Sequence, residues 1–251
     1  MSQKHILIQG AARGLGLALV KRLLADQQTV ITATAREPQA SQALVALRDD
    51  YGESRLHLQP LDITDEDSLI DARRTLGQRH ERLDLMMTCA GLLHDDRGLW
   101  PEKRLADIEP ANLARSFAVN ATGPILMIKH FHDLMTHGER AIIASLSARV
   151  GSISDNGYGG WYAYRAAKAA QNQFTRTASI ELARRSKNLI CVGLHPGTVD
   201  TNLSEPFQKN VPERQLQSAD RAAGHLLGVI AKLNREHSGR VFDWAGKEIT
   251  P

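Results

Sequence analysis

The sequence predicts an α/β protein built on a single doubly wound parallel β-sheet of about seven strands, with helices on both faces. Short β-type runs alternate with longer helical patterns from one end of the chain to the other. This alternation is typical of a parallel sheet, because each parallel strand needs a crossover helix. No internal repeat, low-complexity tract or linker divides the 251 residues. We therefore expect residues 1–251 to form one domain.

The local pattern predicts each element in turn. Apolar and β-branched runs predict strands at His5–Gln9, Thr29–Ala35, Arg55–Gln59, Leu83–Cys89, Ala141–Leu146, Leu189–His195 and Arg240–Asp243. Helical periodicity predicts helices at Leu15–Ala25, Gln39–Asp50, Asp65–His80, Leu113–Thr136, Tyr162–Arg185 and Ala219–Leu233. Two irregular stretches, Leu92–Pro101 and Thr198–Gln217, each follow a predicted strand. Ligands of open α/β sheets bind beyond the carboxyl ends of strands, so both stretches are candidate substrate walls.

Composition and charge exclude several classes of function. Hydrophobic content of 42% and charged content of 24% are ordinary for a soluble globular protein. The 31 basic and 28 acidic residues leave a net charge of +3, too small to indicate binding to nucleic acid or an anionic membrane. We expect no signal peptide and no membrane-spanning segment, and hence a cytoplasmic protein. Cys89 and Cys191 fit neither a disulfide framework nor a metal site, and we expect two buried thiols.

The first predicted strand runs directly into Gly10-Ala-Ala-Arg-Gly14-Leu-Gly16, which precedes a predicted helix. Glycines let such a turn tighten, and backbone N–H groups at a helix N-terminus attract an anion. The sequence therefore predicts a Rossmann-type nucleotide site in which the turn with Gly10, Gly14, Leu15 and Gly16 binds a dinucleotide diphosphate. The spacing Gly-x-x-x-Gly-x-Gly differs from the common Gly-x-Gly-x-x-Gly. A purely structural turn is the alternative interpretation.

The end of the second predicted strand indicates which dinucleotide the site prefers. An NAD site usually has a carboxylate there, which accepts hydrogen bonds from the ribose hydroxyls. This chain has Thr34-Ala35-Arg36 instead. Arg36, helped by Arg13, is placed to bind a 2′-phosphate through its planar guanidinium, which favours NADP(H) over NAD(H). The alternative is two exposed arginines without a partner.

Tyr164 and Lys168 form a candidate proton-transfer pair. They stand four residues apart at the start of an alanine-rich helical pattern, so both side chains lie on one face. An ammonium beside a phenol stabilises the phenolate, and we expect it to lower the pKa of Tyr164 from its ordinary value of about 10. Such a tyrosine can exchange a proton with an alcohol or a carbonyl.

These motifs together resemble the short-chain dehydrogenase/reductase family, across essentially the whole chain. The resemblance implies that Asp62 binds the adenine amino group, with Ile63 beside the ring. It also implies that Ala90 and Gly91, after the fourth strand, contact the cofactor, and that Pro196, Gly197, Val199 and Thr201 lie in the segment that contacts the nicotinamide amide and the phosphates. The chain departs from the family pattern at three positions: Thr88 and Cys89 replace two asparagines, and Gln9 replaces a threonine.

The resemblance also implies the catalytic set. Ser147 matches the serine that holds the substrate carbonyl, although Ser145 is a second candidate. Tyr164 and Lys168 match the catalytic pair, whereas Tyr162 has no lysine four residues later. Asn120 matches the asparagine that links the lysine to a water chain. Asn120, Tyr164 and Lys168 are also expected to contact the cofactor.

The stretch from Ser147 to Tyr164 is similar to that of the C-factor and sniffer-type carbonyl reductases. The resemblance implies an NADPH-dependent oxidoreductase that interconverts a small, largely apolar carbonyl compound and its alcohol, assembled as a homodimer or homotetramer. Leu93, His94, Trp161 and Phe207 are candidate substrate residues, or simply packing residues. A nucleotide-sensing protein on the same fold, and a dehydratase or epimerase, are the alternatives. His130, His132 and His137 lack a completing carboxylate, so we expect no metal site.

Overall fold

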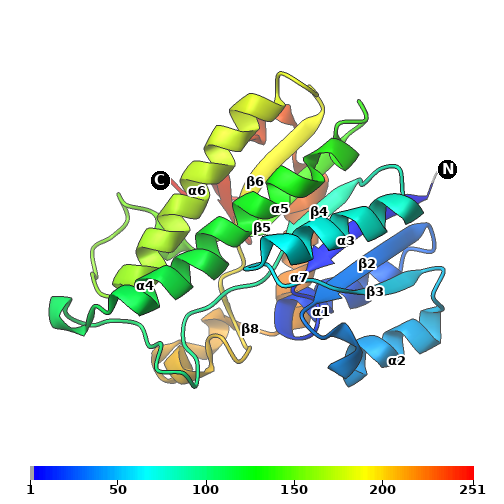
Figure 1. Ribbon diagram of the computed structural model, residues 1–251. Helices are drawn as coiled ribbons and strands as arrows, with labels where there is room; N and C mark the ends of the chain where they lie inside the picture. The colour runs from blue at the N-terminus through cyan, green and yellow to red at the C-terminus, as the bar shows by residue number, and fades with distance from the viewer. Residues whose placement is uncertain (1–2) are drawn as a thin grey trace.

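The computed structural model describes residues 3–251 and confirms the predicted α/β architecture (Figure 1). Seven parallel strands form one sheet in the order β3-β2-β1-β4-β5-β6-β9. Their bounds are β1 Lys4–Gln9, β2 Thr29–Ala35, β3 Leu56–Pro60, β4 Leu85–Thr88, β5 Ala141–Leu146, β6 Leu189–His195 and β9 Val241–Asp243. All lie within two residues of the prediction. The strand order reverses between β1 and β4, and such a switch point is where open α/β sheets bind ligands.

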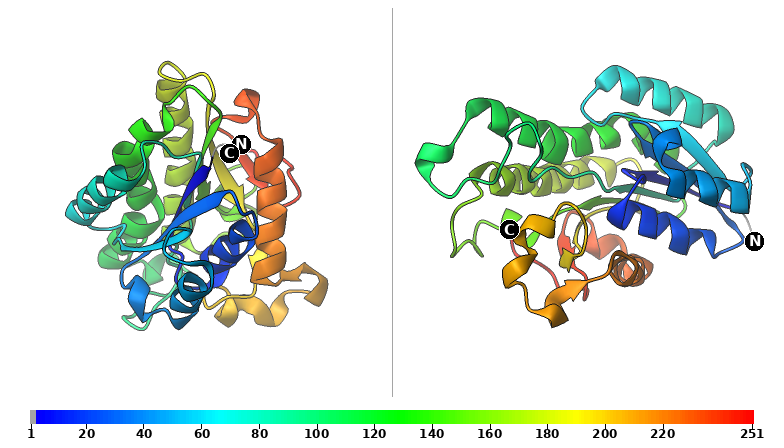
Figure 2. Two further views of the ribbon diagram at one scale, coloured as in Figure 1. Left: turned by 90° about the vertical axis from the view of Figure 1, so that its right-hand side faces the viewer. Right: turned by 90° about the horizontal axis from the view of Figure 1, so that it is seen from below.

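Helices cover both faces of the sheet, as the two views in Figure 2 show. The helices are α1 Gly14–Leu24, α2 Gln42–Tyr51, α3 Glu66–Arg79, α4 Pro110–Phe117, α5 Gly123–Phe131, α6 Tyr162–Leu182 and α7 Ala219–Lys232. Successive strand residues supply two separate cores: Ile6 and Ile8 pack with α1 and α7, whereas Leu7 packs with α3 and α5. The sheet is therefore buried on both faces, and its strands are apolar without alternation.

The helix predicted at Gln39–Asp50 begins at Gln42, after a 3₁₀ turn at Pro38–Ala40, and the helix predicted to reach Arg185 ends at Leu182. A third helix differs more from its prediction. The pattern at Leu113–Thr136 predicts a single helix, but the structure has α4 and α5 joined by a π-helical segment, Ala118–Thr122, and followed by a 3₁₀ turn, His132–Met135. Helix α4 begins at Pro110, ahead of the predicted start at Leu113, because the fixed φ of proline suits the first position of a helix. π-Helical segments often mark functional sites, and this one carries Asn120.

The stretch Thr198–Gln217 is also more ordered than expected. Its two ends pair as short parallel strands, β7 Thr198–Val199 and β8 Leu216–Gln217. Two 3₁₀ helices, Glu205–Asn210 and Glu213–Gln215, lie between them. Residues 198–217, which we call the flap, thus form a loop whose two ends are joined by hydrogen-bonded strands.

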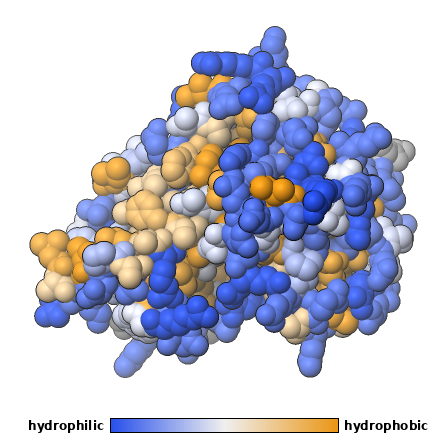
Figure 3. Space-filling view, viewed as in Figure 1, coloured by the Kyte–Doolittle hydropathy of each residue, from blue (hydrophilic) through white to orange (hydrophobic). Residues whose placement is uncertain are grey.

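The surface and the two cysteines complete the description. In Figure 3 apolar side chains are concentrated over α4 and α6. Phe174 and Ile180 of α6 are 39% and 48% exposed, and Leu105, before α4, is 73% exposed.

Cys191 is buried, whereas Cys89 is only half-buried, and both are free thiols. Among residues 3–251, no helix has the length and apolar character needed to span a bilayer.

Three histidines meet at the amino end of the sheet. His5 of β1 lies 4.2 Å from His80, and His57 of β3 lies 5.6 Å from His80, measured between ring centroids. Burial lowers the pKa of all three imidazoles, that of His80 to about 4. Repulsion from His5, His57 and Arg79 contributes to the lowered pKa of His80, after the larger effect of burial. The folded protein therefore resists protonation of this cluster.

This cluster predicts loss of stability in acid. The folded pKa of His80 lies below the unfolded value of about 6.5, so its contribution is present near neutral pH and is lost as the pH falls from 6.5 toward 4. Because His80 is about half solvated, we expect a loss of order 1 kcal/mol between pH 7.5 and 5. His80→Asn should unfold in urea with a shallower dependence on pH. A mutant with the slope of the wild type would contradict this account.

Candidate active site

The carboxyl ends of β1 and β4 are tied together by Gln9. This side chain is 3% exposed, and its Oε1 accepts a hydrogen bond from Ala90 N at 3.2 Å. The backbone supplies a second link, from Cys89 N to Gln9 O at 2.9 Å. Gln9 therefore fixes Cys89 and Ala90, at the end of β4, against the glycine turn that follows β1. The family resemblance marks Gln9 only as a departure.

The glycine turn fits a diphosphate. A Cβ at Gly10 would lie 2.8 Å from Ala90 N, and one at Gly16 would lie 2.2 Å from Gly10 O, so neither position admits a side chain. Arg13 precedes α1 in an extended conformation without a side-chain cap, and the first turn carries no acidic residue. The N–H groups at this helix start are free of side-chain acceptors and suit an anion.

The flap after β6 faces the glycine turn. A Cβ on Gly14 would lie 3.2 Å from Thr201 Cγ2, and one on Gly91 would lie 3.8 Å from Leu203 Cδ2. Gln217 Nε2 donates to Pro196 O at 3.2 Å and so holds the flap to its base. Of the predicted cofactor residues, Val199 and Thr201 lie on the flap and Pro196 and Gly197 lie directly before it, so that Thr201 faces Gly14.

The predicted adenosine end lies beyond β2 and β3. Asp62 Oδ1 accepts hydrogen bonds from Thr64 N at 2.9 Å and from Thr64 Oγ1 at 2.7 Å, which fixes the carboxylate. Ile63 is buried against Gly123 at the start of α5. Ser41, absent from the predicted site, caps α2 and donates to Ala12 O at 2.8 Å. The prediction of a helix at Gln39–Asp50 places Ser41 inside the helix, whereas the structure places it directly before α2 as the cap.

Arg13 and Arg36 both lie exposed at this end of the site. Within residues 3–251, neither guanidinium has a hydrogen bond or an ion pair, and Asp62 is engaged by Thr64 instead. Two unpaired cations therefore border the region where the second strand ends.

The structure brings Tyr164 and Lys168 together on one face of α6. They are 9% and 2% exposed, and Lys168 Nζ lies 5.8 Å from the centroid of the Tyr164 ring. The ammonium donates to Leu146 O at 2.7 Å and to Gln171 Oε1 at 2.8 Å. The end of β5 thus anchors Lys168 directly beside the tyrosine.

The expected lowering of the tyrosine pKa is wrong for the chain by itself. Burial raises the pKa of Tyr164 to about 12 and lowers that of Lys168 to about 7. The physical reason is that desolvation disfavours the charged form of both groups, while Nζ is directed to Leu146 and Gln171 rather than to the phenol. The Tyr164 phenol is therefore neutral at physiological pH.

Ser147 lies immediately after β5 and is 4% exposed. Its Oγ donates to Asn172 Oδ1 at 2.6 Å, and no hydrogen bond joins it to Tyr164 within the described chain. Ser145 is 2% exposed inside β5, paired with Thr88 and Gly193 of the neighbouring strands. Ser147 follows the residue that anchors Lys168, and its role as a carbonyl donor stays a prediction.

Asn120 is fully buried in the π-helical segment. Its Oδ1 accepts from Leu92 N at 3.0 Å, and its Nδ2 donates to Leu92 O at 2.7 Å and to Ser116 Oγ at 3.2 Å. The amide therefore holds the chain that leaves β4. Its side chain makes no direct hydrogen bond to Lys168 in the part of the chain described.

Aromatic rings extend from Tyr164 toward the flap. Trp161 lies 6.3 Å from Tyr164 and 5.1 Å from Phe207, between ring centroids. His94 lies 5.8 Å from Phe207, and its Nε2 is 2.9 Å from Asn202 O. Trp100 joins the cluster at 5.4 Å from Phe207. The predicted substrate residues Trp161, His94 and Phe207 therefore meet, and Leu93 is buried beside His94.

Two further residues at this wall are absent from the prediction. Trp100 lies inside the irregular stretch Leu92–Pro101, and its large aromatic side chain was the available signal. Glu102 is 4% exposed: its Oε2 accepts from Ala163 N at 3.1 Å, and its backbone O accepts from Trp161 N at 2.5 Å. Trp161 has φ of 55°, and it is the one non-glycine residue of positive φ among residues 3–251. Glu102 thus fixes the start of α6.

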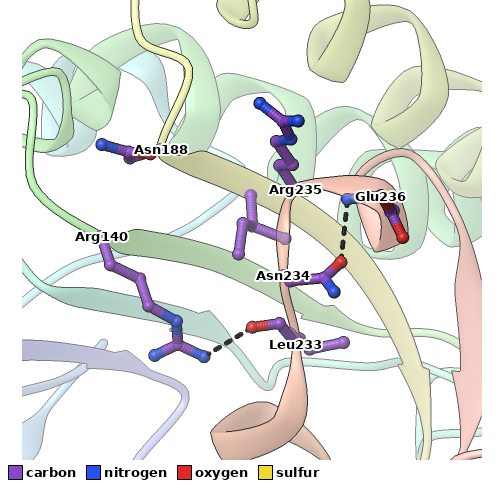
Figure 4. Close-up of a pocket in the computed structure, with 7 residues that line it drawn as sticks. Arg140, Asn188, Leu233, Asn234, Arg235 and Glu236 are labelled. Atoms are coloured by element: carbon purple, nitrogen blue, oxygen red, sulfur yellow. Dashed lines mark hydrogen bonds between the residues drawn. The ribbon is translucent and has the colours of Figure 1, made fainter.

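Two cavities lie away from the Tyr164–Lys168 pair and the aromatic wall, although the second one includes Gly197 at the base of the flap. One, of about 380 Å³, lies at the amino ends of β5 and β6 and is lined by Arg140, Asn188, Ile190, Leu233, Asn234, Arg235 and Glu236 (Figure 4). There Arg140 Nη2 donates to Leu233 O at 3.0 Å. The other, of about 320 Å³, lies between His195 and Trp244. The buried ionisable pair is a better candidate for the active site than either cavity, because it stands at the carboxyl edge of the sheet. In the described part of the chain, no cluster of histidine, cysteine or acidic side chains suits a metal ion.

Comparison with known proteins identifies the family. The model of the short chain dehydrogenases matches residues 4–212. The C-signal protein of Myxococcus xanthus is 36% identical, over 66% of this chain and 92% of its own length. The NADPH-bound carbonyl reductase from chicken fatty liver superposes with a TM-score of 0.86 at 26% identity over the whole of both chains. The carbonyl reductase Sniffer of D. melanogaster, 24% identical, has the same fold, with a TM-score of 0.86 and full coverage of both chains. The chain therefore belongs to the short-chain dehydrogenase family of oxidoreductases, and its fold is similar to that of carbonyl reductases in this family.

Proposed function

We propose that this protein is an NADP(H)-dependent oxidoreductase that transfers hydride between the nicotinamide and a small, largely apolar carbonyl or alcohol substrate. The observation that carries the proposal is the buried Tyr164–Lys168 pair, which lies between a diphosphate-type glycine turn and an aromatic wall. The NADPH-bound carbonyl reductase that shares this fold supports the choice of cofactor.

Residues at five strand ends, on the π-helical segment and on α6 would hold the cofactor. The turn Gly10–Gly16 would bind the diphosphate, Asp62 and Ile63 the adenine, and Arg13 and Arg36 the 2′-phosphate. The nicotinamide half would be held by Ala90, Gly91, Asn120, Tyr164, Lys168, Pro196, Gly197, Val199 and Thr201. The bound nicotinamide supplies or accepts the hydride. The protein supplies orientation, charge and exclusion of water.

Tyr164 would be the general acid in the reductive direction. With its pKa raised to about 12, the phenol is protonated at neutral pH and can donate to the developing alkoxide. The ammonium of Lys168 stabilises the phenolate that remains. Ser147 would leave Asn172 and donate to the carbonyl oxygen, as an oxyanion donor does. Asn120 would position the water that returns a proton to Lys168.

The wall of the site suggests the class of substrate. Trp161, Phe207, His94 and Trp100 present aromatic surface, and the nearby Asp95 and Arg115 pair with each other. An uncharged aldehyde or ketone with an apolar body fits this surface. A non-catalytic nucleotide-sensing or signalling protein is the second candidate, favoured by the 36% identity to the C-signal protein. Oxidation of NADPH with a panel of aldehydes, ketones and quinones separates the two.

Replacing the proposed acid gives the first test of this mechanism. Tyr164→Phe removes the proton donor but keeps the ring, so turnover should fall by about 100-fold or more while the affinity for NADPH stays nearly unchanged. Tyr162→Phe, on a neighbouring position of the same helix, should have a mild effect. Turnover is measured by NADPH absorbance and affinity by fluorescence titration. The reverse order of effects would place the acid at Tyr162.

Cofactor preference gives the second test. Charge-assisted hydrogen bonds from Arg36 and Arg13 to a 2′-phosphate are each worth about 1.5–3 kcal/mol, so kcat/KM should favour NADPH over NADH by roughly 10-fold or more. Ala35→Asp combined with Arg36→Ser should reverse the order, because repulsion is added as attraction is removed. Both cofactors are measured with one aldehyde. Equal efficiencies in the wild type would show that the arginines do not reach the phosphate.

We also propose a homodimer or homotetramer that uses the apolar outer faces of α4, α5 and α6 (Figure 3). Phe174 and Ile180 are large exposed apolar side chains on α6, and a stable interface buries such residues. Light scattering at micromolar concentration should give two or four times the chain mass. Phe174→Glu with Ile180→Glu should shift the species toward the monomer, and a monomeric wild type would overturn the proposal.

A further inference from the structure

Gln171 is a buried polar side chain that the mechanism above does not use. It lies one helical turn after Lys168 on α6 and is 2% exposed. Its Oε1 accepts from Lys168 Nζ at 2.8 Å, while its Nε2 donates to Leu146 O at 3.2 Å. Leu146 O also accepts from Lys168 Nζ at 2.7 Å. The amide, the ammonium and the last carbonyl of β5 thus form a closed triangle of hydrogen bonds.

We propose that Gln171 is a positioning residue for the catalytic lysine: it holds Lys168 Nζ at the end of β5 and stabilises its protonated form. The structural part of this inference stands on the three hydrogen bonds. Its consequence for catalysis rests on the proposed function, in which Lys168 serves as an ammonium.

The amide acts against the effect of burial. Desolvation disfavours a buried ammonium, whereas an acceptor that hydrogen-bonds it favours the charged form. The two ends of the amide act differently, since Nε2 orients the group by donating to Leu146 and Oε1 then points at Nζ. Because burial brings the pKa of Lys168 to about 7, loss of one acceptor changes the protonated fraction at physiological pH.

No other charge competes for this role in the described chain. Burial is the cause of the lowered pKa of Lys168, without a contribution from a charged neighbour. The π-helical segment Ala118–Thr122, packed on α6, carries no ionisable side chain. The ionisable groups on the other elements around α6 are paired elsewhere or neutral. Arg149 pairs with Asp155 and Asp243, Arg115 with Asp95, and Lys129 and His130 with Glu66. Burial lowers the pKa of His195 to about 4, and Arg165, on α6 itself, binds a backbone carbonyl.

A positioning role makes a prediction that simple packing does not. Gln171→Leu keeps the volume but removes the acceptor, so the pKa of Lys168 should fall. Gln171→Glu places a carboxylate at the same atoms, so the pKa should rise, by about one pH unit or more for a charge at this distance. A side chain that only fills space would disturb both variants in the same direction.

The experiment measures Lys168 directly in the protein without cofactor. Protein labelled with [6-¹³C]lysine is titrated by NMR, and Lys168→Met assigns the resonance. The matched controls are Gln173→Leu and Gln173→Glu, the same substitutions on the exposed face of α6, where the side chain contacts Thr177. We expect a lower midpoint in Gln171→Leu, a higher midpoint in Gln171→Glu, and the wild-type midpoint in both controls.

A kinetic measurement separates the inference from the proposed function. The high-pH limb of kcat for carbonyl reduction should move down in Gln171→Leu and up in Gln171→Glu. Equal midpoints in the wild type and both Gln171 variants would overturn the inference, whatever the activity. Opposite NMR shifts without carbonyl reduction in any variant would support the inference and overturn the proposed function.

Discussion

The burial of an ammonium at the end of a central strand is the constraint on which the site depends. Lys168 lies between α6 and the sheet with 2% of its side chain exposed, and a charge in such a place must be hydrogen-bonded. The carbonyl of Leu146 meets this need because β5 ends there, and β5 ends there because the strand pairs in register with β4 and β6. The register of β5 in the sheet therefore determines where the Lys168 Nζ atom is held.

The same dependence holds at the switch point between β1 and β4. Gly16 approaches Gly10 so closely that no side chain fits, which brings the start of α1 over the sheet edge. Gln9 then joins this turn to Ala90, and Thr201 on the flap closes the opposite side. Close backbone approach at Gly10 and Gly16, one buried side chain at Gln9 and the methyl group of Thr201 therefore hold the glycine turn, the end of β4 and the flap together.

The sequence predicts the sheet well because buried parallel strands are short, apolar and bounded by polar residues. β2, β5 and β6 match residue for residue, and the glycine turn and the Tyr164–Lys168 pair are visible as local spacings. The π-helical segment around Asn120 is not predictable from periodicity, because it depends on a distant partner, Leu92. The raised pKa of Tyr164 depends on burial by residues far along the chain. Trp100 and Glu102 come from a loop whose path only the folded structure reveals.

The left-handed backbone at Trp161 has a consequence for anyone who wishes to redesign the aromatic wall. A residue with φ of 55° tolerates glycine, asparagine or aspartate well and a β-branched residue poorly, since Cβ crowds the carbonyl there. Libraries that place valine, isoleucine or threonine at this position would test backbone tolerance as much as substrate fit. Diversity introduced at Phe207 or Trp100 avoids that confusion. The set of residue types that the backbone tolerates therefore differs between Trp161 and the other positions of the aromatic wall.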